Sequence, residues 1–270
     1  MADKGKYLKR ILAVMLTLVM SAGLIFTGTP ENAYAASPKK LVSKVICYTR
    51  VGDSWEKTGV MEFTYNKKGD PVKIYRNNNG YKTVNTYVYS YRKGKKAKAK
   101  QYKKEGGENK QLYCIMTYDK AGRLKENTYV DDLTSSVYKY RKNGYITMID
   151  GEDSSDMWMN YRWKGKVPQL LKVKHSDHKG VYTQTVFNKN GLIEKTSCSN
   201  ARSDGDRRIT YSLVNGRVKA IRIAETKGDV RNHYKYVLKY TNKSVYSSRY
   251  RAMINYITCR YPVYTGTNWF

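Results

Sequence analysis

The 270-residue chain is poor in acidic residues, phenylalanine, proline and histidine. It has 22 Asp and Glu against 51 Lys and Arg, with four Phe, five Pro and three His. It also lacks a glycine-rich phosphate loop and a Gly-x-Ser-x-Gly segment, so the local motifs of nucleotide-binding proteins and serine hydrolases are absent. Nothing in the sequence points to catalysis or to a cofactor. Because catalytic carboxylates can be brought together by the fold alone, an unrecognised hydrolase stays open as an alternative.

Long apolar runs are absent except for Ile11–Phe26. Basic residues precede this run and Ala33-Tyr34-Ala35 follows it, an order typical of a secretory signal with a small-residue cleavage site. The run is short for a membrane span, which needs about 20 apolar residues. We therefore predict a signal peptide over residues 1–35, one β-repeat domain over 36–270 without an integral membrane span, and a secreted or cell-wall-associated location.

The shortage of acidic residues gives the chain a formal charge of +29, or +27 once the leader with its four basic and two acidic residues is removed. Such an excess creates a field that attracts polyanions. The predicted partner is an anionic wall polymer, a polysaccharide or another polyanion, and specific nucleic-acid binding is not expected because no recognised motif is present. The alternative is that lysines such as those in Lys93–Lys100 lie solvated in turns and serve solubility.

Cysteine is also scarce: Cys47, Cys114, Cys198 and Cys259 include no closely spaced metal-binding pair. Four cysteines allow three pairings, and an exported chain can form disulfides. Cys47 and Cys259 lie near opposite ends of the mature chain, so a bond between them would staple the termini. Buried thiols are the alternative.

What the chain does contain is a repeat, in which an aromatic residue is followed three to five positions later by glycine. Successive glycines are 21 to 28 residues apart, the length of two short strands and two turns, which predicts an antiparallel meander of about fifteen strands. An eighth copy at Tyr240 has lost its glycine. The seven complete copies are Tyr65–Gly69, Tyr91–Gly94, Tyr118–Gly122, Tyr140–Gly144, Tyr161–Gly165, Phe187–Gly191 and Tyr211–Gly216.

The stretches before the repeats alternate in polarity. In His233–Tyr240, for example, Tyr234, Tyr236 and Leu238 share one parity, and lysines occupy the other. This period of two is the pattern of a half-buried strand. The predicted fold is therefore all-β, a long up-and-down meander of hairpins that forms a curled sheet or a large barrel.

The period changes near the C-terminus. Tyr246, Tyr250, Met253, Ile254 and Ile257 follow one another at helical spacing. This predicts one short helix over about residues 244–257, which packs on the sheet and plugs one mouth of a barrel.

The unit Tyr118-Asp-Lys-Ala-Gly-Arg-Leu-Lys-Glu126 resembles the YD repeat of Rhs-type bacterial surface and toxin proteins. The resemblance extends over about residues 61–240, although Tyr91, Tyr140 and Tyr161 are followed by Arg instead of Asp. It implies a shell-like β-structure in a cell-surface context and carries no catalytic residues over.

Residues that could bind a ligand fall into two sets. Tyrosines offer rings and hydroxyls, and lysines offer charge. A dense acidic turn could hold Ca²⁺, although its spacing departs from an EF-hand loop and a hydrated turn is the alternative. The binding candidates are Tyr87, Tyr89, Tyr91, Tyr138, Tyr140, Tyr234, Tyr236, Lys95, Lys96 and Lys98, and the metal candidates are Asp150, Glu152, Asp153 and Asp156.

These observations lead to two functional hypotheses. The first is a secreted, non-enzymatic β-repeat protein that binds at the cell envelope or to extracellular polyanions. The second is a carrier of a small apolar or aromatic ligand in a tyrosine-lined barrel cavity.

Overall fold

The computed structural model describes residues 39–131, 133–151, 156–177, 179–199 and 205–259. These residues belong to one compact unit, Pro38–Phe270. The predicted signal peptide lies outside the described residues.

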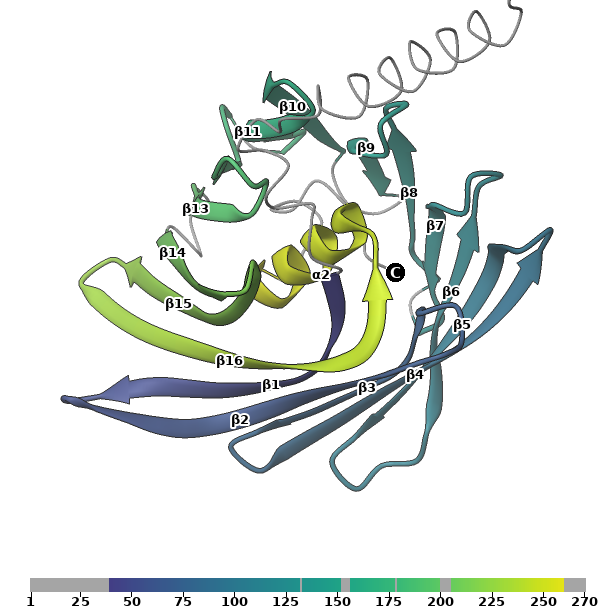
Figure 1. Cartoon of the computed structure of the whole chain (residues 1–270). Coiled ribbons are helices and arrows are strands. Elements are labelled where there is room, and N and C mark those ends of the chain that lie inside the picture. The colour runs from purple at the N-terminus through teal and green to yellow at the C-terminus, as the bar shows by residue number, and fades with distance from the viewer. Residues whose placement is uncertain (1–38, 132, 152–155, 178, 200–204, 260–270) are drawn as a thin grey trace, which may run out of the picture. The chain divides into compact units, whose positions relative to one another are not determined.

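Sixteen antiparallel strands form a closed barrel in the described part of the chain, each strand pairing with its neighbours in sequence and β1 pairing with β16 (Figure 1). The all-β meander of hairpins is confirmed, and its closure into a barrel settles the choice between barrel and open sheet. The strands are β1 (Lys39–Val51), β2 (Ser54–Tyr65), β3 (Pro71–Asn78), β4 (Tyr81–Arg92), β5 (Lys95–Glu105), β6 (Gln111–Tyr118), β7 (Leu124–Tyr129), β8 (Ser135–Tyr140), β9 (Ile146–Gly151), β10 (Met157–Lys164), β11 (Val167–His175), β12 (Thr183–Phe187), β13 (Ile193–Cys198), β14 (Gly205–Val214), β15 (Arg217–Lys227) and β16 (Val230–Val245).

The apolar parity of the strands faces the barrel interior. On β2, Met61 and Phe63 are buried, and on β6 Cys114, Met116 and Tyr118 are buried in the same core cluster. Strand β5 begins at Lys95, so Lys93–Lys100 is mostly strand and only its first two residues are turn. The reading of this segment as a solvated turn is therefore wrong.

Three of the repeated glycines, Gly69, Gly122 and Gly191, end hairpin turns that share one set of hydrogen bonds. In the turn of Asn66, its side-chain oxygen accepts from the backbone amides of Lys68 and Asp70, and the amide of Gly69 donates to its carbonyl. Asp119 and Asn188 make the same bonds in their own turns. Gly69 has φ +83°, a backbone conformation that favours glycine, which explains the recurring spacing.

Five tyrosine hydroxyls each connect a hairpin to the one before it. Each donor lies near the end of a strand, and each acceptor is the backbone carbonyl two residues after the preceding repeat glycine. The donor–acceptor pairs, at 2.5 to 3.0 Å, are Tyr89–Pro71, Tyr140–Leu124, Tyr161–Ile146, Tyr211–Ile193 and Tyr240–Val218.

Helix α2 (Ser247–Cys259) lies across one end of the barrel (Figure 1). Its apolar stripe is buried, and two of its polar side chains bond to backbone groups of the β12–β13 turn and of β15. Asn255 donates 3.1 Å to the carbonyl of Gly191, and the Tyr250 hydroxyl accepts 2.8 Å from the amide of Val218. The short C-terminal helix is thus confirmed, beginning three residues later than predicted. No helix among the described residues has the length and apolar character to cross a membrane.

The structure contains no disulfide bond between Cys47 and Cys259. Cys47 lies on β1, whereas Cys259 ends α2 close to Arg207 of β14, and β15 and β16 lie between these two strands. Burial raises the pKa of the Cys259 thiol to about 12, so it behaves as a neutral core residue.

Candidate functional site: a cationic mouth

A hollow of about 1010 Å³ lies where α2 covers the end of the barrel. Its walls are the β6–β7, β8–β9 and β10–β11 turns together with one side of α2. Asp70 is the one acidic residue among its described lining residues. We call this hollow the cationic mouth, because it is lined by six cationic residues, Lys96, Arg123, Arg141, Lys166, Arg249 and Arg251.

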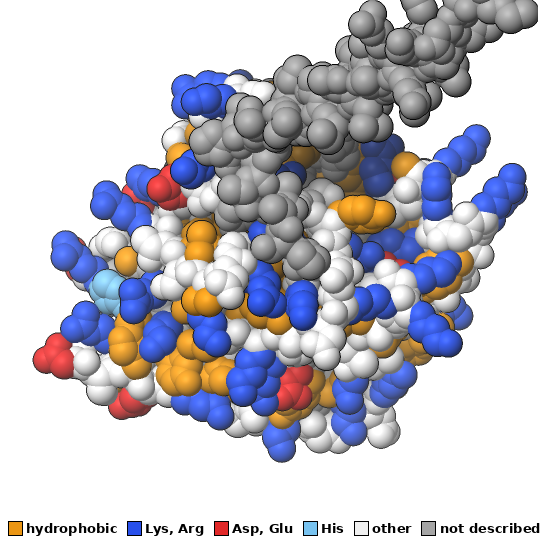
Figure 2. All heavy atoms as spheres, in the orientation of Figure 1, with side chains coloured by type: hydrophobic (Ala, Val, Ile, Leu, Met, Phe, Trp, Pro, Cys, Tyr) orange, Lys and Arg blue, Asp and Glu red, His pale blue; other side chains and the backbone are white. Residues whose placement is uncertain are grey.

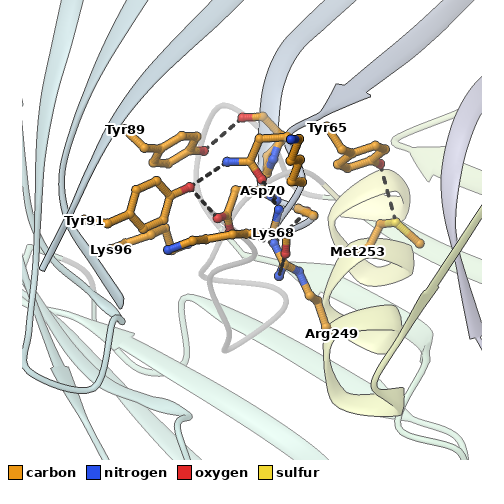
Figure 3. A network of polar contacts seen from close by, with 12 residues as sticks. Tyr65, Lys68, Asp70, Tyr89, Tyr91, Lys96, Arg249 and Met253 are labelled. Carbon is orange, nitrogen blue, oxygen red and sulfur yellow. Dashed lines mark hydrogen bonds and ion pairs between the residues drawn. The ribbon is translucent and has the colours of Figure 1, made fainter. Parts of the chain in front are cut away.

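Asp70 is already held by the protein (Figure 3). Its carboxylate, 7% exposed, accepts 2.7 Å hydrogen bonds from Tyr91 and Arg249 and lies 3.9 Å from the ammonium of Lys96. Burial opposes ionisation, but the Tyr91 hydrogen bond and the two cations outweigh it and hold the pKa of Asp70 below its usual value. The single acidic group of the mouth is therefore neutralised internally.

Lys96 is a deeply placed cation of the mouth, with its side chain 13% exposed. Its ammonium lies 4.8 Å from the ring centre of Tyr118 and 5.9 Å from that of Tyr89. A register shift between Ser90 and Tyr91 accompanies its pairing with Tyr91. Burial lowers the pKa of Lys96 to about 8, Asp70 opposes this and Arg249 adds to it, so near neutral pH its proton is held weakly for a lysine.

An aromatic wall stands beside the cations. The ring of Tyr145 meets Trp163 edge-on, with centroids 4.9 Å apart and planes at 89°, and Trp163 lies 5.3 Å from Tyr161. The guanidinium of Arg141 lies 5.9 Å from the Tyr161 ring. Because Tyr145 and Trp163 also line the hollow, a ligand there meets both apolar rings and charge.

The structure brings some of the sequence-predicted binding residues together at this end. Tyr89, Tyr91 and Lys96 surround Asp70, and Tyr140 lines the mouth. Lys95 donates to the carbonyl of Lys120 in the neighbouring turn.

The other predicted residues lie elsewhere. Tyr87 is 5% exposed in the core, and Tyr138 and Tyr236 pack against the core from inside the barrel. Tyr234 donates 3.3 Å to Glu225, and Lys98 is exposed on β5. Sequence reasoning missed Arg123, Arg141, Arg249 and Arg251, although Arg141 directly follows a repeat tyrosine and marks a departure from the YD pattern.

The acidic turn gives no assembled metal site in the part of the chain that the structure describes. Asp150 lies 3.7 Å from the ammonium of Lys139. Asp156 is described, but Glu152 and Asp153 lie outside the described residues. No group of three or more His, Cys, Asp or Glu side chains that could hold a metal forms among the described residues.

Chemically, the mouth is suited to anions. Arginine presents a planar fork of donors that matches carboxylate and phosphate oxygens. Four of the six cations are arginines, and the wider surface has the same sign, since Figure 2 shows many Lys and Arg side chains and few acidic ones on the visible face. The fold and the mouth together define a closed β-barrel with a hollow at one end that cationic side chains line.

No known protein-family model matches the sequence, and no curated protein matches it. Among solved structures, the chain is similar to a porin-like protein from Bacteroides uniformis, with TM-score 0.42, 10% identity, and coverage of 75% of this chain and 100% of that one. It is similar to a porin-like protein from Bacteroides vulgatus, with TM-score 0.36, 11% identity and coverage of 76% and 100%. A DUF1329 family protein from Desulfovibrio piger gives TM-score 0.24, 10% identity and coverage of 81% and 96%. At these TM-scores, the similarities carry no conclusion about this chain.

Proposed function

We propose that the protein is a non-enzymatic binding barrel that holds anionic polymers outside the cell through its cationic mouth. The observation that carries this proposal is the charge of the mouth, where six cations line one hollow and the only described carboxylate, Asp70, is already bonded to Tyr91 and Arg249. Arg123 pairs with Asp119 at 2.6 Å, so the cations of the mouth still outnumber the carboxylates that pair with them. Cations in excess on one concave surface attract polyanions and orient them.

The setting outside the cell rests on the sequence. The leader pattern of residues 1–35 predicts export, and the YD-like turns fit a cell-surface protein. The polymers available there include phosphate-bearing wall polymers and acidic polysaccharides. Both present repeated anionic oxygens, which arginine forks bind.

The tyrosines that would line a carrier cavity are largely committed to the fold. Tyr87 is in the core, and the hydroxyls of Tyr89 and Tyr140 bond to backbone carbonyls. This favours the polyanion binder over a carrier of an apolar ligand.

Inorganic polyphosphate tests the proposal, because it is an anionic polymer without sugar rings. Fluorescently labelled polyphosphate is titrated with the wild type and with the R141Q/K166Q variant, and anisotropy is recorded at several salt concentrations. Both replaced side chains are exposed at the mouth, so the fold is retained. We expect affinity about tenfold weaker in the variant and falling with salt in the wild type.

The matched control is K73Q/K125Q, which removes the same charge from exposed outward positions on β3 and β7. It should bind within about twofold of the wild type, since isolated surface charges contribute little. Equal losses in the two variants would show that total charge, and not the mouth, holds the polymer. Binding that does not change with salt would also overturn the proposal.

A further inference from the structure

The outer wall of the barrel over β14, β15, β16, β1 and β2 places like charges opposite one another. Arg222 of β15 pairs in register with Lys235 of β16, and Arg208 of β14 pairs with Lys195 of β13. Arg222 lies between the buried Ile221 and Ile223, so its side chain points outward. Like charges directly opposite one another destabilise a sheet. A bound anion would relieve that repulsion.

These cations line a groove. A hollow of about 430 Å³ on this wall is lined by Arg50, Arg208, Arg222, His233 and the indole of Trp55, among others. It continues into a second hollow of about 840 Å³, which shares Arg208 and His233. The smaller hollow has no acidic residue among its described lining residues, whereas Asp206 and Glu225 line the larger one together with Arg208 and Arg231.

The acidic partners of the wall do not reach its central arginines. Arg50 pairs with Asp53 at 2.9 Å, and Lys195 pairs with Asp206 at 2.9 Å. In the part of the chain that the structure describes, neither Arg208 nor Arg222 forms an ion pair within 4.0 Å. Their charge is therefore available to a ligand.

Aromatic rings border the same groove. Trp55 is 36% exposed, and the ammonium of Lys235 lies 5.6 Å from its ring centre and 5.3 Å from that of Tyr48. Trp55 is the aromatic side chain that combines exposure with a place in the groove lining.

We propose that this wall is a second binding site, separate from the mouth, for an acidic polysaccharide whose sugar ring stacks on Trp55 while its carboxylates pair with Arg208 and Arg222. Neighbouring strands lie about 4.8 Å apart, so cations on successive strands form a ladder that a chain crossing the strands meets one after another. Single-stranded nucleic acid is the less suitable ligand, because its successive bases stack on successive aromatic rings, and this groove offers one exposed ring.

The probe is an oligogalacturonate, titrated calorimetrically into the full chain. The variants are R208Q/R222Q, which removes the central charges, and W55A, which removes the ring. The K73Q/K125Q variant is the charge-matched control, and R141Q/K166Q separates the wall from the mouth. Thermal melts verify that each variant is folded. A neutral oligosaccharide of the same length and a single-stranded DNA oligonucleotide are titrated in parallel.

We expect about tenfold weaker galacturonate binding in R208Q/R222Q, a smaller but measurable loss in W55A, and less than about twofold change in K73Q/K125Q. R141Q/K166Q should lose at most the part of the galacturonate binding that belongs to the mouth and keep the part that R208Q/R222Q removes, so a failure of the mouth proposal leaves this one standing. Equal losses in R208Q/R222Q and K73Q/K125Q would overturn the site. Tighter binding of DNA than of galacturonate through the same arginines would overturn the ligand assignment, and unchanged binding in W55A would remove the stacking role.

Discussion

The hydroxyl of Tyr161 donates a 2.7 Å hydrogen bond to the backbone carbonyl of Ile146, the second residue after Gly144. Ile146 begins β9 and Tyr161 lies on β10, so the bond ties the start of one strand to the next strand of the meander. Tyr140 and Tyr211 repeat the relation with Leu124 and Ile193. Phenylalanine could fill the same space but could not donate, which explains why tyrosine stands at these positions.

Tyr161→Phe should therefore lower the free energy of unfolding by about 1 kcal/mol, because the buried carbonyl of Ile146 loses a donor while ring packing is kept. Urea denaturation measures the change. Tyr81→Phe is the control, since the Tyr81 side chain is 56% exposed, and it should change stability by less than about 0.5 kcal/mol. Equal stability of wild type and Tyr161→Phe would contradict a stabilising role for the bond.

Asp70→Asn should alter the acid sensitivity of the fold. The pKa of Asp70 is lower in the folded protein than in the unfolded chain. Its ionised form therefore stabilises the fold fully at pH values above the unfolded-state pKa, and this contribution is lost as pH falls through the folded-state pKa. The variant should be about 2 kcal/mol less stable at pH 7, with a shallower loss of stability between pH 5 and pH 2. Chemical denaturation across that range is the measurement, and parallel curves for the two proteins would refute the assignment.

Lys96 should be the most readily acylated lysine of the mouth near pH 8. Burial lowers its pKa to about 8, and it lines two hollows through which a small reagent can enter. The fold favours the deprotonated form of Lys96, which accumulates from about pH 8. The free energy of unfolding therefore increases as pH rises from about 8 toward the pKa of this lysine in the unfolded chain. Acetic anhydride labelling followed by mass spectrometry should place half-maximal reactivity of Lys96 near pH 8. Exposed Lys98 serves as the comparison, and identical pH profiles would disprove the shift.

Gly191→Ala should disturb the packing of α2 on the barrel. An added Cβ would lie 3.2 Å from side-chain carbons of both Arg251 and Val167, and φ is +72°. Gly80→Ala is the matched control, with φ +88° and nothing within 4 Å of the added carbon. In both variants the positive φ should lower the free energy of unfolding by about 1 kcal/mol, and in Gly191→Ala overpacking should lower it by about 1 kcal/mol more. Amide hydrogen exchange should accelerate in α2 for Gly191→Ala only. Equal exchange rates in the two variants would argue against packing of α2 on the barrel at this glycine.

Local patterning was enough to predict the parity of the strands, the hairpin repeat and the C-terminal helix. Tyr234 and Leu238 share a face because alternate residues in a strand point the same way, and this depends only on the sequence between them. The meander follows because each strand pairs with its sequence neighbour. The strand count was low by one: β1 pairs antiparallel with β16, and a closed up-and-down meander of antiparallel strands requires an even number.

The mouth could not be derived in that way. Arg249 meets Asp70 across 179 residues of sequence, and the contact exists only because α2 crosses the end of the barrel where the β2–β3 turn lies. The position of Lys96 depends on a register shift that no alternation pattern records. The candidates that the structure brings together, Tyr91 and Lys96, were proposed for their chemistry, whereas their shared partner Asp70 was not recognised.

The pairing of β1 with β16 also constrains the order of assembly. Lys39 at the start of the barrel pairs with Val245 near its end, so this seam cannot form until almost the whole domain has been synthesised. Non-local pairings of this kind slow folding, because a long loop must close before any contact offsets the entropy. A nascent chain can complete its hairpins one by one, yet it acquires the ring of strands and the place for α2 only in its final step.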